Sequence, residues 1–187
     1  MPLLILIGIL AVVGLWAMFA YNRLVSLRNE TQNGWRQIDV QLKRRHDLIP
    51  NLVNTVTGAM EFERNTLTAV MDARGRAMGA AGPADAARKE GELGAVLGRL
   101  LAVTENYPQL KANDNVKMLQ EELSSTENKI GFARQFYNDI ATKFNIVRET
   151  FPSSLIAGGF AKAELFQVTD DAERAVPAVD LSLKPPA

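Results

Sequence analysis

The chain has 187 residues, and its 21 basic side chains balance its 21 acidic ones, so no net charge draws it to nucleic acid. It contains no cysteine, which excludes disulfides, cysteine–zinc sites and a cysteine nucleophile. His46 is the only histidine, so a site that needs two histidines from one chain is excluded as well.

The N-terminal segment, residues 1–22, is apolar and carries no charged side chain. About 20 helical residues cross a hydrocarbon core of about 30 Å, so this segment predicts one membrane span with the lipid bilayer as its partner. A cleaved signal peptide and a buried core helix are the alternatives. No Lys or Arg precedes the run, and few core helices are apolar on every face. The span includes Leu3, Leu10, Leu15, Trp16 and Tyr21.

Positive charge follows the span but does not precede it. Arg23, Arg28 and Arg36 lie just after the apolar run, and only the α-amino group lies before it. The positive-inside rule therefore predicts that the rest of the chain lies in the cytoplasm. Three arginines are a modest bias, and a periplasmic location is the alternative.

The helix of the span is expected to leave the membrane without a break. Leu24, Ile38 and Leu42 belong to one helical stripe, and no proline or glycine-rich linker separates that stripe from the span. We therefore predict one helix from the span to about Arg45. Asp47 is then expected to cap a new helix, with residue 50, a proline, in its first turn, where the missing N–H is harmless.

Two further helices are predicted before the last one. The first starts at Asp47 and carries apolar positions up to Val70. Residues 79–83, which read GAAGP, predict a loop. The second carries Leu93, Leu97 and Leu100 and ends before Pro108.

The clearest periodicity lies between residues 116 and 151, where apolar side chains recur at alternating steps of three and four. This pattern predicts a long bundle or coiled-coil helix of about 50 Å. Asn113 or Asp114 is the expected N-cap, and Pro152 stops the helix. Its predicted core positions are Leu119, Leu123, Ile130, Tyr137, Ile140, Phe144, Val147 and Phe151.

These elements predict an all-α fold in which an N-terminal transmembrane helix continues into an elongated, antiparallel four-helix up-and-down bundle. We divide the chain into an anchor (1–22), a bundle (23–152), a short apolar segment (153–168) and an extended tail (169–187). The tail has acidic side chains and three prolines. We expect its few hydrophobic residues to dock against the helical bundle.

The short apolar segment offers a set of contact residues. It is too short to cross a bilayer, and it has three possible roles: capping the bundle, touching lipid or contacting a neighbouring protein. The candidate interaction residues are Leu155, Ile156, Phe160, Leu165 and Phe166.

Two long strings resemble the LemA family. They are YNRLVSLRN with GWRQIDVQLKRRHDLIPNLVNTV (residues 21–29 and 34–56) and the block from Asn106 to Asn145. The resemblance covers residues 21–181 and departs at Gly34, where alanine is usual. It implies a bacterial inner-membrane protein with one N-terminal span and an antiparallel helical bundle. No enzymatic activity is established for the family, whose members include a protein tied to magnetosome membranes.

No constellation for catalysis, metal binding or cofactor binding is found. Asp47 is interpreted as an N-cap beside a solvated His46, and a di-iron bundle would need more histidines than one. No phosphate-binding loop or nucleophile motif occurs. The basic run at residues 43–45 lies about 30 Å beyond the span, too far for attraction to lipid, and is expected to pair with acids on another helix or subunit.

The leading functional hypothesis is a non-enzymatic membrane scaffold that forms a homo-oligomer. The second is an adaptor for a membrane protein partner, such as a membrane protease or envelope-stress component, which would bind the short apolar segment or the tail. The third is membrane remodelling by amphipathic surfaces.

Overall fold

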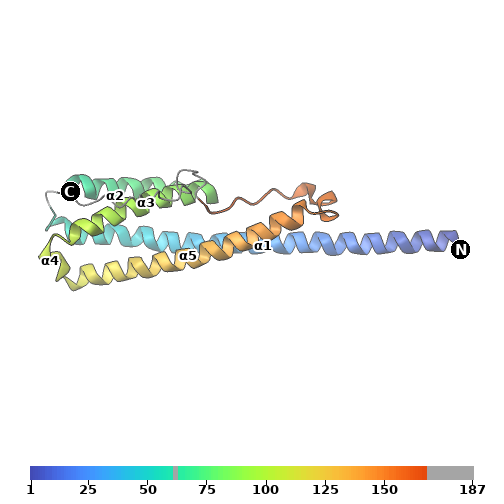
Figure 1. Ribbon diagram of the computed structural model, residues 1–187, viewed down its shortest axis with the longest axis horizontal. Helices are drawn as coiled ribbons and strands as arrows, with labels where there is room; N and C mark the ends of the chain where they lie inside the picture. The colour runs from blue at the N-terminus through green and yellow to red at the C-terminus, as the bar shows by residue number, and fades with distance from the viewer. Residues whose placement is uncertain (61–62, 168–187) are drawn as a thin grey trace, which may run out of the picture.

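All regular structure is helical within the described residues, which are 1–60 and 63–167 of the computed structural model (Figure 1). The all-α class, with an apolar N-terminal helix that continues into a helical bundle, is confirmed. Residue 168 and the predicted tail at 169–187 lie outside the described residues. In chain order the elements are α1 (Pro2–Thr57), α2 (Arg64–Met78), α3 (Pro83–Thr104), α4 (Pro108–Lys111), α5 (Asp114–Glu149), η2 (Ser153–Leu155) and η3 (Ala157–Gly159).

Helix α1 is unbroken for 56 residues, which makes it about 84 Å long by the rise of an α-helix. The predicted break between Arg45 and Asp47 is therefore wrong. Leu42, Arg45 and Ile49 follow one another at steps of three and four and are all buried, so the inward-facing stripe continues through the charged sequence. The helix predicted to begin at Asp47 is divided between the end of α1 and α2.

Pro50 lies inside α1, where a proline costs about 3 kcal/mol because it removes a hydrogen bond and crowds the preceding turn. The bond that is lost is the one to the carbonyl oxygen of His46, four residues earlier. Arg74 of α2 donates to that oxygen from Nε at 2.7 Å. The proline thus frees a backbone acceptor, and α2 supplies the donor that satisfies it.

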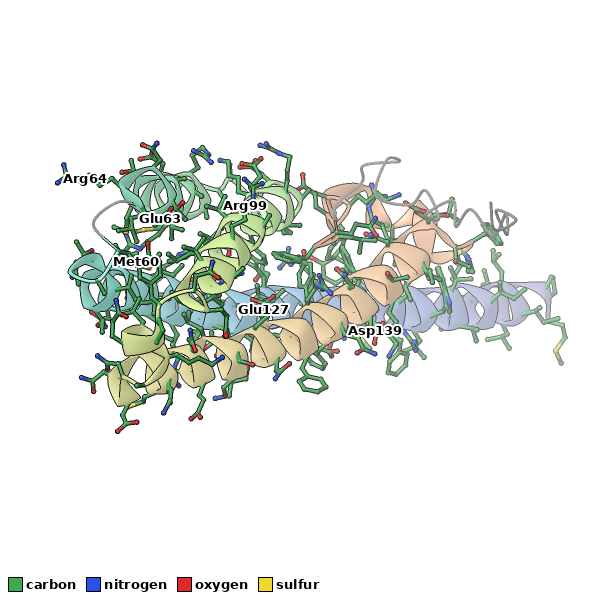
Figure 2. The ribbon with its side chains drawn as sticks, turned by 60° about the vertical axis from the view of Figure 1, so that its left-hand side comes forward. Met60, Glu63, Arg64, Arg99, Glu127 and Asp139 are labelled. Atoms are coloured by element: carbon green, nitrogen blue, oxygen red, sulfur yellow. The ribbon has the colours of Figure 1, made fainter. Side chains whose placement is uncertain are left out.

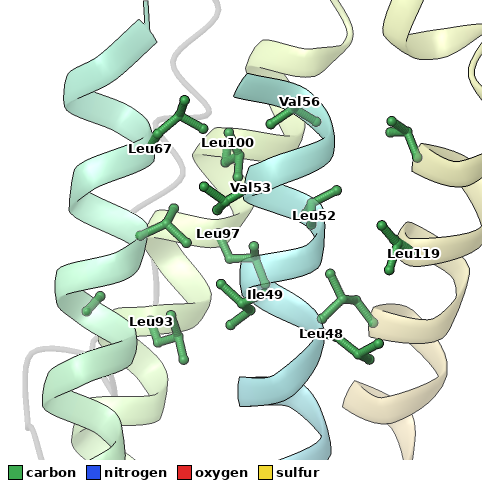
Figure 3. Packing of buried hydrophobic residues seen from close by; sticks show 14 of the residues in the cluster. Leu48, Ile49, Leu52, Val53, Val56, Leu67, Leu93, Leu97, Leu100 and Leu119 are labelled. Carbon is green, nitrogen blue, oxygen red and sulfur yellow. The ribbon is translucent and has the colours of Figure 1, made fainter. Parts of the chain in front are cut away.

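Helices α2 and α3 form a hairpin that packs against the membrane-distal part of α1 (Figure 1). The connection lies where residues 79–83 predicted a loop, and Gly82 adopts a positive φ of 86° there. Figure 3 shows how side chains from α1, α2, α3 and α5 meet in this part of the core. The cluster includes Ile49, Val53, Leu67, Leu93, Leu97, Leu100 and Leu119.

Helix α5 returns antiparallel to α1 along most of the rod (Figure 1). The Asn113 side chain accepts hydrogen bonds from the backbone N–H groups of Asn115 and Val116, which makes it the N-cap. The two long helices approach closely at Gly34, where an added Cβ would lie 3.4 Å from Cα of Tyr137. This is an ordinary van der Waals distance, so an alanine would also fit at this contact.

Beyond η3, residues 160–167 form an extended strap that lies antiparallel to α5. Two asparagines of α5 hold it by pairing with its backbone as another strand would. Asn145 donates from Nδ2 to the Ala163 carbonyl and accepts from the Ala163 N–H, both at 2.9 Å. Asn138 does the same with Phe166, at 3.1 and 2.8 Å.

The spacing of the two asparagines matches the spacing of the strap. Seven helical residues rise about 10.5 Å, and three extended residues cover about 10 Å, so both amide pairs form at once. The Tyr137 hydroxyl, between them, donates to the Glu164 carbonyl at 2.6 Å. Burial, with a contribution from the Glu164 carboxylate, raises the pKa of Tyr137 to about 12, so this donor stays protonated well into the alkaline range.

The pairing of Pro50 with Arg74 predicts a coupled pair of substitutions. Arg74→Met leaves the His46 carbonyl unsatisfied and should lower the free energy of unfolding by about 1–3 kcal/mol. In a Pro50→Ala background, the alanine supplies the helical N–H, so the same change should cost less, with a coupling of about 0.5–3 kcal/mol. Urea unfolding of the four proteins in mild detergent, followed by circular dichroism, measures both. An equal cost of Arg74→Met in the two backgrounds would contradict the assignment.

Candidate functional site

Most of the apolar part of α1 has no protein around it, and only its last residues meet the end of α5. Leu3, Leu10, Leu15 and Tyr21 are each more than half exposed, and only Trp16 of the predicted span residues is partly covered. Within the described residues, α1 is the one helix long and apolar enough to cross a membrane. Lipid is the medium that accepts such a surface, and the N-terminal helix anchors the chain in a membrane.

The predicted core stripe of α5 faces α1 and the distal hairpin for most of its length. Leu119, Leu123, Ile130, Tyr137, Ile140 and Phe144 are buried, and Val147 is partly buried against the cluster around Phe144. Phe151 is 75% exposed. Its prediction as a core position is wrong because α5 ends at Glu149, so Phe151 has left the helical stripe.

The five candidate interaction residues of the short apolar segment separate into two groups. Phe160 and Phe166 are buried, and Ile156 and Leu165 are partly buried against the α1–α5 pair. Leu155 is 72% exposed. Four of the five therefore contribute to the chain's own core, and they are not free to present a contact patch to another protein.

A buried ionic cluster joins three helices where the sequence predicted a helix junction. Glu90 of α3 lies 2.6 Å from His46 Nε2 and 3.2 Å from an Arg45 guanidinium nitrogen, and all three side chains are buried. The same Arg45 nitrogen lies 3.2 Å from Glu127 of α5, which occupies the space between α3 and α5 in Figure 2. The buried Arg45 charge is thereby paired with one buried and one exposed carboxylate.

This cluster corrects the interpretation of His46 as solvated and of Asp47 as an N-cap. The basic run around Arg45 does pair with acids on other helices, as expected: Arg44 lies 3.8 Å from Glu122. Gly94 of α3 makes room for the cluster, since a Cβ there would lie 3.3 Å from Arg45. The described residues contain no group of three side chains that could hold a metal ion.

The opposite side of the α1–α5 pair carries an exposed apolar patch. We call it the open face, defined by Val40 of α1 and by Phe132 and Phe136 of α5, which are 61%, 75% and 48% exposed. These side chains line a shallow groove of about 550 Å³ together with Gln37 and Lys129. The strap and the α2–α3 hairpin pack elsewhere on the pair, against His46 and Trp35.

Sequence reasoning did not identify the open face. Phe132 and Phe136 fall between the positions of the core stripe, which drew attention away from them. Two aromatic residues four positions apart on the outward side of a helix are the signal that was available, because such side chains are neighbours on the helix surface. Large exposed aromatic side chains gathered in one patch are typical of an interaction surface.

Comparison with known proteins gives matches over most of the chain. The model of the LemA family matches residues 34–181. The magnetosome proteins MamQ 1 and MamQ 2 of Paramagnetospirillum magneticum are each 29% identical over 194 residues, which cover 88% of this chain and 71% of theirs. Protein LemA of Metamycoplasma hominis is 28% identical over 148 residues, covering 79% of this chain and 66% of its own.

Removing the central carboxylate of the buried cluster should be costly. Glu90→Gln leaves the Arg45 charge buried with one acid fewer, and we expect the free energy of unfolding to fall by about 3–5 kcal/mol. Glu92→Gln is the matched control on the same helix, because Glu92 pairs with Arg88 in an exposed site and should cost less than about 1 kcal/mol. Urea unfolding in detergent compares them. Equal losses of unfolding free energy in the two variants would show that the buried cluster contributes no more to stability than an exposed ion pair.

Proposed function

The chain belongs to the LemA family, and we propose that this member is a membrane-anchored scaffold whose copies associate side by side. The proposal places it in the bacterial inner membrane and gives it no enzymatic role. The observation that carries it is the open face, where Phe132, Phe136 and Val40 are exposed side by side and line one groove.

The anchor supplies the reason for choosing a second copy as the partner. Every copy is held in the same bilayer by the same helix, and α1 passes from the anchor into the rod without a break. Neighbouring rods therefore stand parallel and at equal height. A two-fold axis along the rods brings Phe132 and Phe136 of one copy to the groove that the same residues line in the other.

Confinement to a membrane also reduces the interface area that two copies must bury to stay associated. A stable complex in solution buries about 800 Å² on each partner, which is more than three side chains provide. Copies that share a bilayer are already oriented and concentrated, so much of the entropy cost of association is met in advance. A small aromatic patch is then sufficient to hold neighbouring rods together.

The alternatives draw less support from the geometry. An adaptor that binds a membrane protease or envelope-stress partner through the short apolar segment would need Phe160 and Phe166 to be accessible, and both are buried in the chain's own core. The tail, the other contact predicted for an adaptor, lies outside the described residues. The relatives named magnetosome proteins fit a role at a membrane. Membrane remodelling remains compatible with a scaffold, as a consequence of many anchored copies packing together.

Self-association predicts that the full-length protein in lipid nanoparticles has the mass of an oligomer. Replacing Phe132 and Phe136 together by serine should convert it to the monomer without unfolding, because both side chains are exposed. Met118→Ser is the control, since Met118 is a large apolar side chain of the same helix, 55% exposed, that lies off the open face. A wild-type monomer at physiological lipid ratios would contradict the proposal.

The location of the bundle is a separate part of the proposal. Arg23, Arg28 and Arg36 favour the cytoplasm over the periplasm. A Met118→Cys variant places the only thiol of the chain at an exposed site far from the membrane. A thiol reagent that cannot cross the inner membrane should label it only after lysis, whereas labelling in cells with a permeable outer membrane alone would indicate a periplasmic bundle.

A further inference from the structure

Along the axis of α1, the end of α5 and the turn that follows it reach the same level as the last residues of the apolar part of α1 (Figure 1). A groove there is lined by Trp16, Phe19, Ala20 and Arg23 of α1 and by Ile146, Val147, Thr150 and Ser153 of α5 and the following turn. The Tyr21 ring also contacts the Phe160 ring edge-on, with 5.6 Å between their centroids. Residues 150–156, which we call the basal turn, thus reach the level of the span.

The depth of this contact follows from helix geometry. The apolar run ends at Tyr21, and Arg23 is the first charged residue after it. Trp16 precedes Tyr21 by five residues and therefore lies about 7.5 Å deeper along the helix. Interfacial elements bury their apolar faces about 5–10 Å into the boundary between headgroups and acyl chains. The basal turn lies at that depth.

Two large apolar side chains of the basal turn have no cover from the protein. Phe151 is 75% exposed and Leu155 is 72% exposed, and the neighbouring Ile146 is 57% exposed. The other large side chains of this region, Phe144 and Phe160, are buried in the core between α1 and α5. We infer that the basal turn enters the bilayer interface and that Phe151 and Leu155 insert among the lipid acyl chains as a second membrane contact.

Four backbone N–H groups of the basal turn have hydrogen-bond partners within the protein. The N–H groups of Thr150, Ser154, Leu155 and Ile156 donate to backbone carbonyls within the turn or the last turn of α5, at 2.9–3.1 Å. The Thr150 hydroxyl donates to the Ile146 carbonyl at 2.7 Å. Because these donors are satisfied internally, entry into the interface does not leave them without partners.

Rigid connections hold the basal turn at this level. Arg148 donates from Nε to the Phe160 carbonyl at 2.6 Å, and Lys162 pairs with Glu149 at 2.9 Å. The asparagine pairs of the strap continue this attachment along α5. A second contact beside the span restricts rotation of α1 about its own axis as well as its tilt, so the open face keeps one direction in the plane of the membrane.

A single-cysteine label tests the depth of the basal turn, because the natural chain has no cysteine. Leu155→Cys, carrying a nitrobenzoxadiazole fluorophore, is reconstituted as full-length protein in phosphatidylcholine–phosphatidylglycerol vesicles. Leu15→Cys serves as the control within the span, and Met118→Cys as the control at the distal end, where the side chain is 55% exposed. Quenching is measured with lipids spin-labelled near the headgroup and with aqueous iodide.

We expect the Leu155 label to be quenched several-fold more by the spin-labelled lipid than the Met118 label, and to be shielded from iodide. Quenching by iodide equal to that of Met118 would place the basal turn in water and overturn the inference. Shielding from iodide without lipid quenching would indicate a protein cover and would also overturn it. Absence of lipid quenching at Leu15 would refute the span on which the inference depends.

Discussion

The structure depends on the continuity of α1, which carries one buried stripe from the end of the apolar segment to the far end of the bundle. Two features oppose that continuity: the charged sequence around Arg45 and the proline four residues beyond His46. Glu90 pairs with the buried Arg45 charge, and Arg74 satisfies the carbonyl that Pro50 leaves free. Both partners belong to the α2–α3 hairpin, so the hairpin is attached to α1 at the point where α1 would otherwise break.

The other elements follow from this long helix. Helix α5 needs a partner of comparable length, and it returns along α1 to the level of the membrane, where Phe144 and Leu24 meet in the same cluster. The strap then reverses direction and is held by Asn138 and Asn145. A pair of antiparallel helices has two broad sides, and the chain covers one of them, which leaves the open face for the association that we propose.

Much of the fold could be predicted from the sequence because apolar periodicity reports burial directly. Periodicity predicts the stripe of α5, and residue preferences predict a cap at Asn113 or Asp114 and the loop at residues 79–83. The buried cluster was not predicted, because Arg45 and His46 occupy core positions with polar side chains and their partner Glu90 is distant in sequence. The strap depends on side-chain amides that mimic a backbone, and Phe132 and Phe136 lie outside the core pattern, so periodicity does not reveal either.

The central claim is that α1 remains one rigid helix from the membrane into the bundle. Spin labels at Arg23→Cys and Asn54→Cys, both exposed positions on α1, test it in a chain without other cysteines. Pulsed electron paramagnetic resonance is measured on the protein in lipid, diluted with unlabelled protein so that only distances within one chain contribute. A continuous helix predicts one narrow distribution of distances between the two labels, centred at about 46 Å. A broad or markedly shorter distribution would show that α1 bends or breaks between the two labels and would contradict the account.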